Sequence, residues 1–297
     1  MNWQSELISL YLLICKAYKS NLFAYCERRT NYANLGFTDE VITIFIHGVL
    51  NKRRTLKEIY EETKRYLLAW FPKLPSYTAF VQRINRLQDV FVPLLEWLQA
   101  QLPPSFLSGT HQLMDSMPII MAQQGRRFTA TVAPELATSN GYCAAKRLYD
   151  YGVKLSVVGC YRKGNLPIPT SVGLMNAGLG DRKIYEQILP ELSGDVFADK
   201  AYQKDNCPVL SEAAVVLHTP VKKQKGQPVL DAADRLLSSA ISSLRQPIES
   251  FFNWLEEKTS IQKASKVRSS PGLIVHVFGR MAAAFFSLLR QYGYTAC

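Results

Sequence analysis

Histidine is scarce in this 297-residue sequence, and its six cysteines are scattered without a CxxC pair or a cysteine–histidine cluster. That pattern argues against a zinc site or a disulfide framework and favours a reducing compartment. No His-x-His pair is present, so a tyrosine-dependent single-strand relaxase is disfavoured. No GxxxxGKS/T loop is present either, which disfavours ATP hydrolysis.

Long apolar runs and low-complexity tracts are also missing. Runs such as Leu7 to Cys15 fall short of the roughly 20 residues that span a bilayer, and no cleavable signal peptide is evident. We therefore expect a cytoplasmic protein without membrane contact. With 47% apolar and 20% charged residues the whole chain is expected to fold. A typical domain has about 150 residues, so a chain of 297 residues is expected to form two domains.

Positive charge is in excess along both halves of the chain. Lysine and arginine number 35 against 24 aspartates and glutamates, and the isoelectric point is about 9.3. A basic surface suits a polyanion such as double-stranded DNA. A modest basic excess is also common in proteins that bind no nucleic acid, so charge alone leaves both interpretations open.

Residues 1–102 predict an all-helical domain, because their apolar side chains recur at three- and four-residue spacing. A helix-turn-helix unit fits within such a domain. The expected helices are one that Thr38 or Asp39 caps and that ends near Asn51, one that Thr55 caps and that runs to about Phe71, and one from Ser76 to about Leu87.

The third of these helices carries a polar face with Gln82, Arg83 and Arg86. Such side chains can donate hydrogen bonds to phosphates and to base edges in a major groove. A solvated face of an ordinary helical bundle shows the same stripe. The three residues are candidate DNA contacts that need support from elsewhere in the chain.

Residues 103–110 contain prolines and a glycine and are interpreted as a linker. Beyond them, short apolar runs alternate with turns and helices, so 111–297 predicts an α/β or α+β domain with a mixed sheet covered by helices. The expected strands are 112–117, 153–160, 168–174, 196–198 and 214–218; the expected helices are 182–189, 204–212 and 239–257; the expected loops are 120–150 and 220–237.

Two aspartates lie where this pattern places strands. Asp115 interrupts the apolar run from Leu113 to Met117, and a carboxylate there is costly to bury unless it is paired or bound to a cation. Asp199 follows the apolar segment Val196 to Ala198, at the strand end where open α/β sheets bind ligands. A single aspartate at a strand end is more often a turn residue.

Glu249 lies at the margin of an apolar helical stripe. Arg245 is four residues earlier, so the two share a helix face and can form a surface salt bridge. Pro247 between them leaves two interpretations open: it lies inside the helix, where it removes a hydrogen bond, or it marks the first turn of the helix.

Five segments, taken in order, resemble the DDE transposases of bacterial insertion sequences, in particular the insertion sequence 982 group. They are Met114–Pro118, Gly141–Arg147 running into Tyr151–Leu155, Asp199–Tyr202, the Arg245-xxx-Glu249-xx-Phe252 helix, and Arg268–Gly272. The resemblance implies a catalytic domain similar to ribonuclease H and retroviral integrase, preceded by an all-α DNA-binding domain. It also implies an endonuclease and strand-transfer activity in DNA transposition, carried out by a homodimer on terminal inverted repeats and target DNA.

By this resemblance Asp115, Asp199 and Glu249 are the catalytic acids and hold two magnesium or manganese ions. These hard cations prefer oxygen ligands, and two of them about 4 Å apart can activate a nucleophile and stabilise the leaving oxygen. Glu256 or Glu257 would replace Glu249 if the register is wrong. Relatives carry a His-Asp pair where this chain has Gly180-Asp181, and Asp181 is interpreted as a helix cap.

Basic side chains around these motifs are the remaining candidate DNA contacts, because contacts to phosphate position DNA without reading its sequence. They are Lys146, Arg147, Lys154, Lys200, Lys222, Lys223, Lys225, Arg245, Lys263, Lys266 and Arg268. Two alternatives stay open. A nuclease of the same fold would carry the same acids, and a transposase-derived DNA-binding protein that has lost catalysis would not need them.

Overall fold

The computed structural model describes residues 2–23, 38–107, 109, 111–143, 148–188, 192, 194–202 and 215–292. The chain divides into two compact units. A helical unit contains residues 1–102 and 255–297, and an α/β unit contains residues 103–254. Residues 255–297, which the sequence placed in the second domain, therefore belong with the N-terminal helices. The expected helix 204–212 lies outside the described residues.

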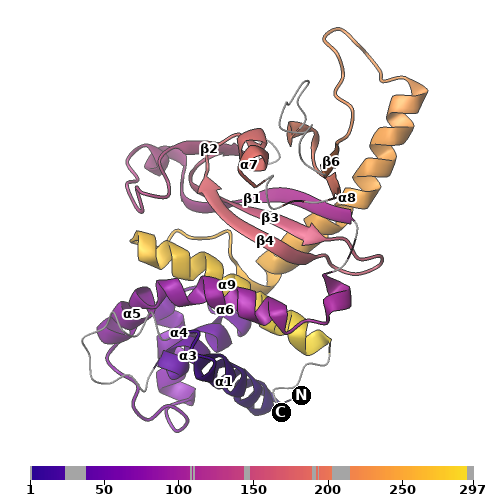
Figure 1. The fold of residues 1–297 in the computed structure, drawn as a ribbon. Coiled ribbons are helices and arrows are strands. Elements are labelled where there is room, and N and C mark those ends of the chain that lie inside the picture. The colour runs from indigo at the N-terminus through magenta and orange to yellow at the C-terminus, as the bar shows by residue number, and fades with distance from the viewer. Residues whose placement is uncertain are drawn as a thin grey trace. The chain divides into compact units, whose positions relative to one another are not determined.

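The helical unit is built around one long apolar helix. Helix α9 packs against α6 and α3, and α1 packs against α3; Figure 1 shows α9 and α6 side by side. Of residues 1–102, the parts that the structure describes (2–23 and 38–102) contain helices and no strand, in agreement with the all-helical prediction. The helices of the unit are α1 (Trp3–Lys19), α3 (Thr38–Leu50), α4 (Leu56–Tyr66), α5 (Tyr77–Arg86), α6 (Phe91–Ala100) and α9 (Ser270–Gln291).

The N-terminal caps of α4 and α5 agree with the sequence prediction. The Thr55 hydroxyl accepts a hydrogen bond from the Glu58 backbone N–H, and the Glu58 carboxylate accepts one from the Thr55 N–H, which completes a capping box. Ser76 caps α5 in the same way by accepting from the Ala79 N–H. Helix α4 ends at Tyr66 rather than near Phe71, because the chain turns before Pro72.

Helix α9 is long and apolar enough to span a membrane by length and composition, which the sequence analysis did not anticipate. Of its most apolar stretch, 83% is buried inside the protein. Such burial is typical of the core helix of a soluble protein, and α9 supplies much of the core of the helical unit.

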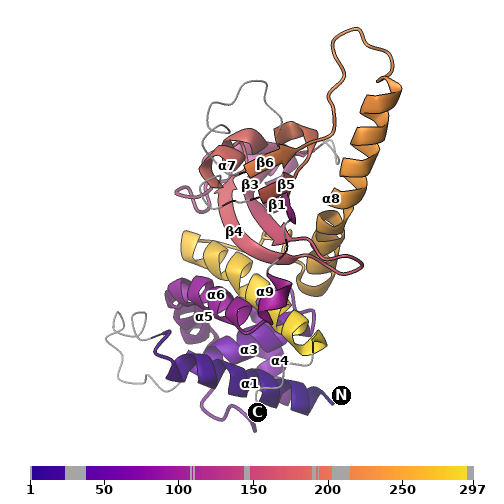
Figure 2. The same ribbon diagram turned by 45° about the vertical axis from the view of Figure 1, so that its right-hand side comes forward.

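The α/β unit contains a mixed six-stranded sheet in the order β2-β3-β1-β5-β6, with β4 paired to β3. Strand β3 is antiparallel to β1, β2 and β4, whereas β5 runs parallel to β1 and β6 parallel to β5. Figures 1 and 2 show this sheet as a curled layer. The strands are β1 (His111–Gln123), β2 (Asn140–Cys143), β3 (Leu148–Cys160), β4 (Ile168–Asn176), β5 (Gly194–Phe197) and β6 (Val215–His218).

The expectation of a loop over residues 120–150 was wrong at both ends. Strand β1 continues to Gln123 past a register shift between Ile120 and Ala122. The short strand β2 pairs with the beginning of β3, where the rings of Tyr142 and Tyr149 lie 4.6 Å apart. A bulge and a four-residue strand leave little periodicity in the sequence, so the pairing partner rather than the local pattern defines these strands.

Helices α7 and α8 accompany the sheet in the described part of this unit. Helix α7 (Asp181–Ile188) shares a buried cluster with β1 and β5 through Tyr185, Met114 and Val196. Helix α8 (Ala232–Thr259) begins earlier than expected, inside the expected loop 220–237. Its first turns and the segment before it extend away from the sheet (Figure 2), with Leu236 75% exposed.

Pro247 lies inside α8, so of the two interpretations of this proline the one that places it in the first turn is excluded. A proline inside a helix costs about 3 kcal/mol. Ile248, Phe251 and Leu255 are fully buried on the same helix, and each such side chain contributes roughly 1.5–3 kcal/mol by leaving water. Burial of this apolar stripe therefore outweighs the cost of the proline.

Gly152 is required where β3 passes the irregularity in β1. A Cβ atom at this position would overlap the carbonyl oxygen of Ile119, which is backbone and cannot rotate away. We expect Gly152→Ala to lower the free energy of unfolding of the α/β unit by about 2–4 kcal/mol, measured by urea unfolding. Gly125→Ala is the control, since a Cβ there meets nothing within 4 Å, and equal stability of the two variants would contradict the prediction.

Candidate active site

Asp115 lies in the middle of β1 and is mostly buried, with 20% of its side chain exposed. Its neighbours Leu113 and Met114 are fully buried. One carboxylate oxygen, Oδ1, accepts a hydrogen bond of 2.8 Å from the Ser116 backbone N–H. The other, Oδ2, accepts one of 2.8 Å from Arg245 Nη1. The strand thus delivers a charged group to a site that compensates it, as the sequence pattern predicted.

Arg245 connects two acids from different elements. Its Nη1 donates to Asp115 on β1 and its Nη2 donates to Glu249, one turn later on α8. The guanidinium is 15% exposed, whereas the Glu249 side chain is 52% exposed. The bond to Asp115 shows that Arg245 and Glu249 do not form a simple surface pair. Bonding to Arg245 also distinguishes Glu249 from Glu256, the alternative catalytic glutamate. The Glu256 carboxylate instead accepts a hydrogen bond from the Gln262 N–H.

Asp199 follows β5 and starts a short turn of 3-10 helix, Lys200–Tyr202. Its Oδ1 accepts the Lys200 N–H at 2.7 Å, and its carbonyl oxygen accepts the Tyr202 N–H at 3.0 Å. Because β5 runs parallel to β1, the chain after β5 carries Asp199 into electrostatic reach of Asp115.

The pKa of Asp115 is raised from 3.8 to about 6, and burial is the largest cause. Arg245 and the Ser116 N–H lower the pKa and offset part of the rise from burial. The negative charges of Asp199 and Glu249 add smaller rises. Asp115 is therefore a carboxylate whose ionised form needs positive charge nearby.

Asp181 contacts the residue next to Asp115, a feature that the cap interpretation missed. Its Oδ1 accepts a hydrogen bond from Lys154 Nζ at 2.9 Å and one from the Ser116 hydroxyl at 3.2 Å. Consecutive residues in a strand point to opposite faces, so Ser116 meets Asp181 of α7 while Asp115 meets Arg245 of α8. The cost of burying Lys154 in β3 was the sequence signal for such a partner.

Lys154 and Lys223 are engaged inside the α/β unit. Besides Asp181, Lys154 Nζ donates to the Leu179 carbonyl oxygen at 3.0 Å. Lys223 Nζ donates to the Pro228 carbonyl oxygen at 2.7 Å. Lys200, beside Asp199, is exposed, as are Lys222, Lys223 and Lys225. Lys146 and Arg147 lie outside the described residues, so their predicted role stays a prediction.

In the helical unit, the candidate residues of α5 differ in accessibility. Arg83 is half-buried and its Nη2 donates to the Thr38 hydroxyl at 2.8 Å, which ties α5 to α3. Gln82 and Arg86 are exposed. Lys263, Lys266 and Arg268 are also exposed, in the segment before α9. The hydrogen bond to Thr38 favours a structural role for Arg83 over the predicted role in DNA binding.

The three predicted acids suit a divalent cation by chemistry. Carboxylate oxygens are the ligands that magnesium and manganese prefer, and one arginine serves both Asp115 and Glu249. Over the part of the chain that the structure describes, no three His, Cys, Asp or Glu side chains are gathered closely enough to hold a metal ion. The Glu249 side chain is 52% exposed and pairs with Arg245, so it can turn toward a cation without disturbing the core.

Comparison with known proteins adds no assignment: no family model, no curated protein and no solved structure matches this chain. The described residues form a mixed α/β unit with a curled sheet and a helical unit. The acids, their partners and the distribution of positive charge are therefore the features that bear on function.

The raised pKa of Asp115 predicts how its charge affects stability. The folded-state pKa lies near 6 and the ordinary value is 3.8, so the contribution of this group is fully present below about pH 4 and is lost as pH rises through 6. Asp115→Asn does not titrate. In metal-free buffer, its free energy of unfolding relative to the unsubstituted chain should rise by about 1–3 kcal/mol from pH 4 to pH 7.5.

Urea unfolding at several pH values measures this difference. A difference that stays flat with pH for Asp115→Asn would show that Asp115 is not a desolvated carboxylate.

Proposed function

We propose that the chain is a metal-dependent DDE transposase that cuts and joins DNA at the ends of an insertion sequence. The observation that carries the proposal is the Arg245 bridge between Asp115 and Glu249, together with the effect of Asp199 on the pKa of Asp115. Glu249 is thereby linked to Asp115 through a shared arginine and Asp199 through its charge, and these are the three acids that the resemblance selects.

The arrangement of the sheet supports a ribonuclease H-like interpretation of the α/β unit. The acids lie on the first strand, after a later strand that is parallel to it, and on the helix that follows the last strand. These are the first-strand aspartate, second aspartate and helix glutamate positions of the resemblance. Strands β4, β3 and β1 pair antiparallel, and β5 and β6 continue the sheet in parallel with β1. This order is compatible with all three positions lying in one region of the sheet.

In the proposed mechanism Asp115, Asp199 and Glu249 would hold two magnesium or manganese ions. When bound, such ions supply Lewis acidity and lower the pKa of the attacking water or 3′-hydroxyl. The chain itself keeps Asp115 ionised through Arg245 and the Ser116 N–H. It also fixes the Asp199 carboxylate against the Lys200 N–H. These contacts orient the acids before DNA arrives, which reduces reorganisation during the reaction.

Arg245 has a second role in this proposal. It bonds to carboxylate oxygens that metal ligation would use, so its guanidinium would turn to a DNA phosphate, for which its planar donors are well suited. Exposed Lys200, Lys222 and Lys225 would add phosphate contacts. A homodimer acting on two terminal repeats, in the bacterial cytoplasm, belongs to the same proposal.

A nuclease of the same fold is the second candidate, because it would use the same acids. A strand-transfer assay with a labelled donor end and a target duplex separates the two. The proposal predicts joined product that requires magnesium or manganese and that disappears with EDTA. Hydrolysis of the donor end without any joined product would replace the transposase with a nuclease.

Substitutions at the acids test the catalytic assignment. We expect Asp115→Asn, Asp199→Asn and Glu249→Gln each to slow donor-end cleavage by roughly 10³-fold, since metal ligation accounts for several kcal/mol of transition-state stabilisation. Glu256→Gln is the matched control on the same helix, because its carboxylate bonds to the Gln262 N–H. Loss of cleavage in Glu256→Gln with activity retained in Glu249→Gln would show that the helix register is wrong.

A further inference from the structure

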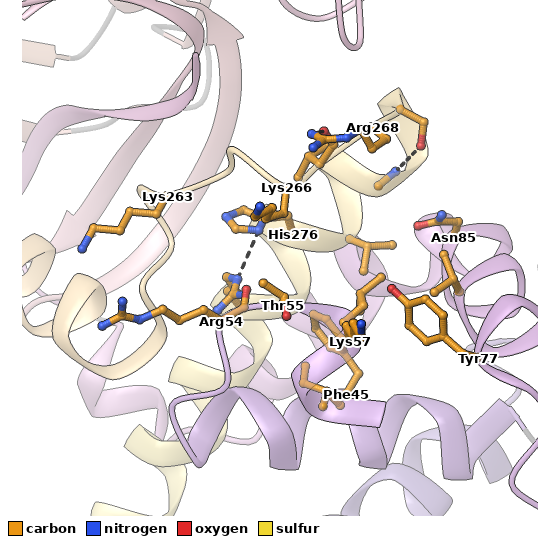
Figure 3. A pocket seen from close by; sticks show the side chains of 18 residues that line it. Phe45, Arg54, Thr55, Lys57, Tyr77, Asn85, Lys263, Lys266, Arg268 and His276 are labelled. Atoms are coloured by element: carbon orange, nitrogen blue, oxygen red, sulfur yellow. Dashed lines mark hydrogen bonds between the residues drawn. The ribbon is translucent and has the colours of Figure 1, made fainter. Parts of the chain in front are cut away.

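The helical unit contains a pocket of about 400 Å³ that the proposed catalytic site does not use. Its walls come from α3, α4, α5, the segment 263–269 and α9. Figure 3 shows Tyr77 and Asn85 of α5 on one side of the pocket and Arg54 and Lys263 reaching out on the opposite side. Segments far apart in the sequence therefore share one cavity.

Positive charge dominates this pocket. Its lining contains no aspartate or glutamate among the described residues. His276, also in the wall, has its pKa lowered to about 3 by burial and by the charge of Arg280, so it is neutral at pH 7. The cationic lining residues are Arg54, Lys57, Lys263, Lys266, Arg268 and Arg280.

Arg280 is the buried member of this set and holds the wall together. Burial lowers its pKa to about 10, so it stays charged at pH 7. Its guanidinium donates to the Thr259 and Arg54 carbonyl oxygens, which fixes the backbone of Arg54 at the edge of the pocket. The pocket is thus a built feature of the unit rather than a chance gathering of long side chains.

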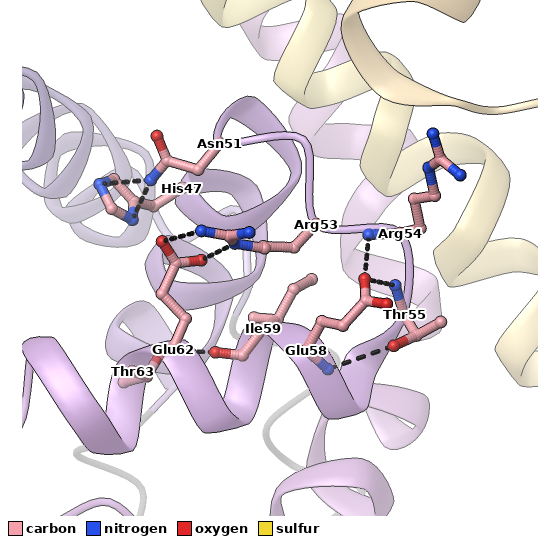
Figure 4. Close-up of polar contacts among 9 residues, drawn as sticks. All are labelled: His47, Asn51, Arg53, Arg54, Thr55, Glu58, Ile59, Glu62 and Thr63. Atoms are coloured by element: carbon pink, nitrogen blue, oxygen red, sulfur yellow. Dashed lines mark hydrogen bonds and ion pairs between the residues drawn. The ribbon is translucent and has the colours of Figure 1, made fainter.

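The other cations lack acidic partners. Across the described ranges of the chain, the side chains of Arg54, Lys57, Lys263 and Lys266 form no hydrogen bond or ion pair. Glu58, the acid adjacent in sequence to Lys57, is occupied by the backbone N–H groups of Arg54 and Thr55 in the capping box (Figure 4). Uncompensated cations that converge on a cavity favour an anionic ligand.

The rest of the lining favours a nucleotide unit over a small inorganic anion. Phe45, Ile59 and Val275 contribute apolar surface. The Oδ1 atom of Asn85 is buried without a hydrogen-bond partner in the structure, so a ligand with a donor group can satisfy it. A cavity of this size with apolar walls and few convergent polar groups is typical of ligand sites.

We propose that this pocket binds the phosphodiester backbone of the DNA end, with one nucleotide reaching Asn85. The inference rests on the proposed function, because it takes DNA as the ligand. It moves the DNA-contacting face of α5 from Gln82, Arg83 and Arg86 to the face of Tyr77 and Asn85, which lines the pocket. It also joins Lys263, Lys266 and Arg268 with Arg54 and Lys57 into one binding site.

The salt dependence of binding by the full chain tests this proposal. The double variant Lys57→Ala/Lys266→Ala removes two cations from the pocket, and Lys19→Ala/Lys64→Ala removes two exposed lysines of the same unit from outside it. The probe is a labelled duplex of random sequence, because phosphate contacts are independent of sequence. Each phosphate contact contributes about −0.9 to the slope of log K against log salt.

We expect the pocket variant to flatten this slope by roughly 1–2 and to weaken binding about tenfold or more at low salt, while the control keeps the slope of the unsubstituted chain. Equal slopes for the two double variants, or no duplex binding by the unsubstituted chain, would overturn the proposal. Unchanged thermal unfolding of both variants shows that they remain folded.

A competition with inorganic phosphate at constant ionic strength distinguishes free phosphate from DNA. The proposal predicts that millimolar phosphate leaves the duplex bound. Selective displacement from the unsubstituted chain but not from the pocket variant would assign the pocket to free phosphate instead. The strand-transfer assay tests the proposed function separately. Joined product together with equal salt slopes for the two double variants would reject DNA binding in the pocket and leave the transposase proposal intact. A flatter slope for the pocket variant without any cleavage would support DNA binding in the pocket and reject the transposase proposal.

Discussion

The cost of burying the Asp115 carboxylate is the constraint around which this site of the α/β unit is organised. Burial is the largest cause of the raised pKa of Asp115, and the charges of Asp199 and Glu249 add smaller rises. The guanidinium of Arg245 offsets part of this cost by binding Asp115 and Glu249 at once. For this bridge to form, α8 has to remain helical through Pro247, since only an unbroken turn keeps Arg245 and Glu249 on one face.

The same constraint explains why two faces of β1 carry polar groups. Asp115 is compensated from α8, and Ser116 is held by Asp181, which in turn pairs with Lys154. Asp115 and Lys154 each have a charged partner from another element, as the cost of burying unpaired charge requires. The site is therefore ordered before any cation or DNA binds, and ligand binding would exchange existing partners rather than create order.

Much of the site could be predicted because single residues conflicted with their surroundings. Asp115 was recognised as a site residue because it is an aspartate within an apolar strand. Thr55 was recognised as the cap that begins α4. The contacts of Asp181 with Lys154 and Ser116 were missed, because an aspartate that caps a helix and one that pairs with a lysine look alike in sequence. Strand β2, the helical continuation through Pro247 and the packing of α9 with the N-terminal helices depend on distant partners, which local periodicity does not report.

Basic side chains have different surroundings in the two units. In the α/β unit, Arg245 and Lys154 compensate acids, whereas in the helical unit several lysines and arginines converge on a pocket without any acid among its described lining residues. Net charge alone does not distinguish these uses, because it counts paired and unpaired cations equally.

The central claim is that Asp115, Asp199 and Glu249 hold divalent metal. Crystals of the chain grown with manganese chloride test it most directly through the anomalous signal of manganese. The claim predicts manganese within about 2.0–2.3 Å of carboxylate oxygens of Asp115 and Asp199, with Arg245 released from at least one acid. Crystals without manganese at these oxygens, in which Arg245 still bridges Asp115 and Glu249, would contradict it.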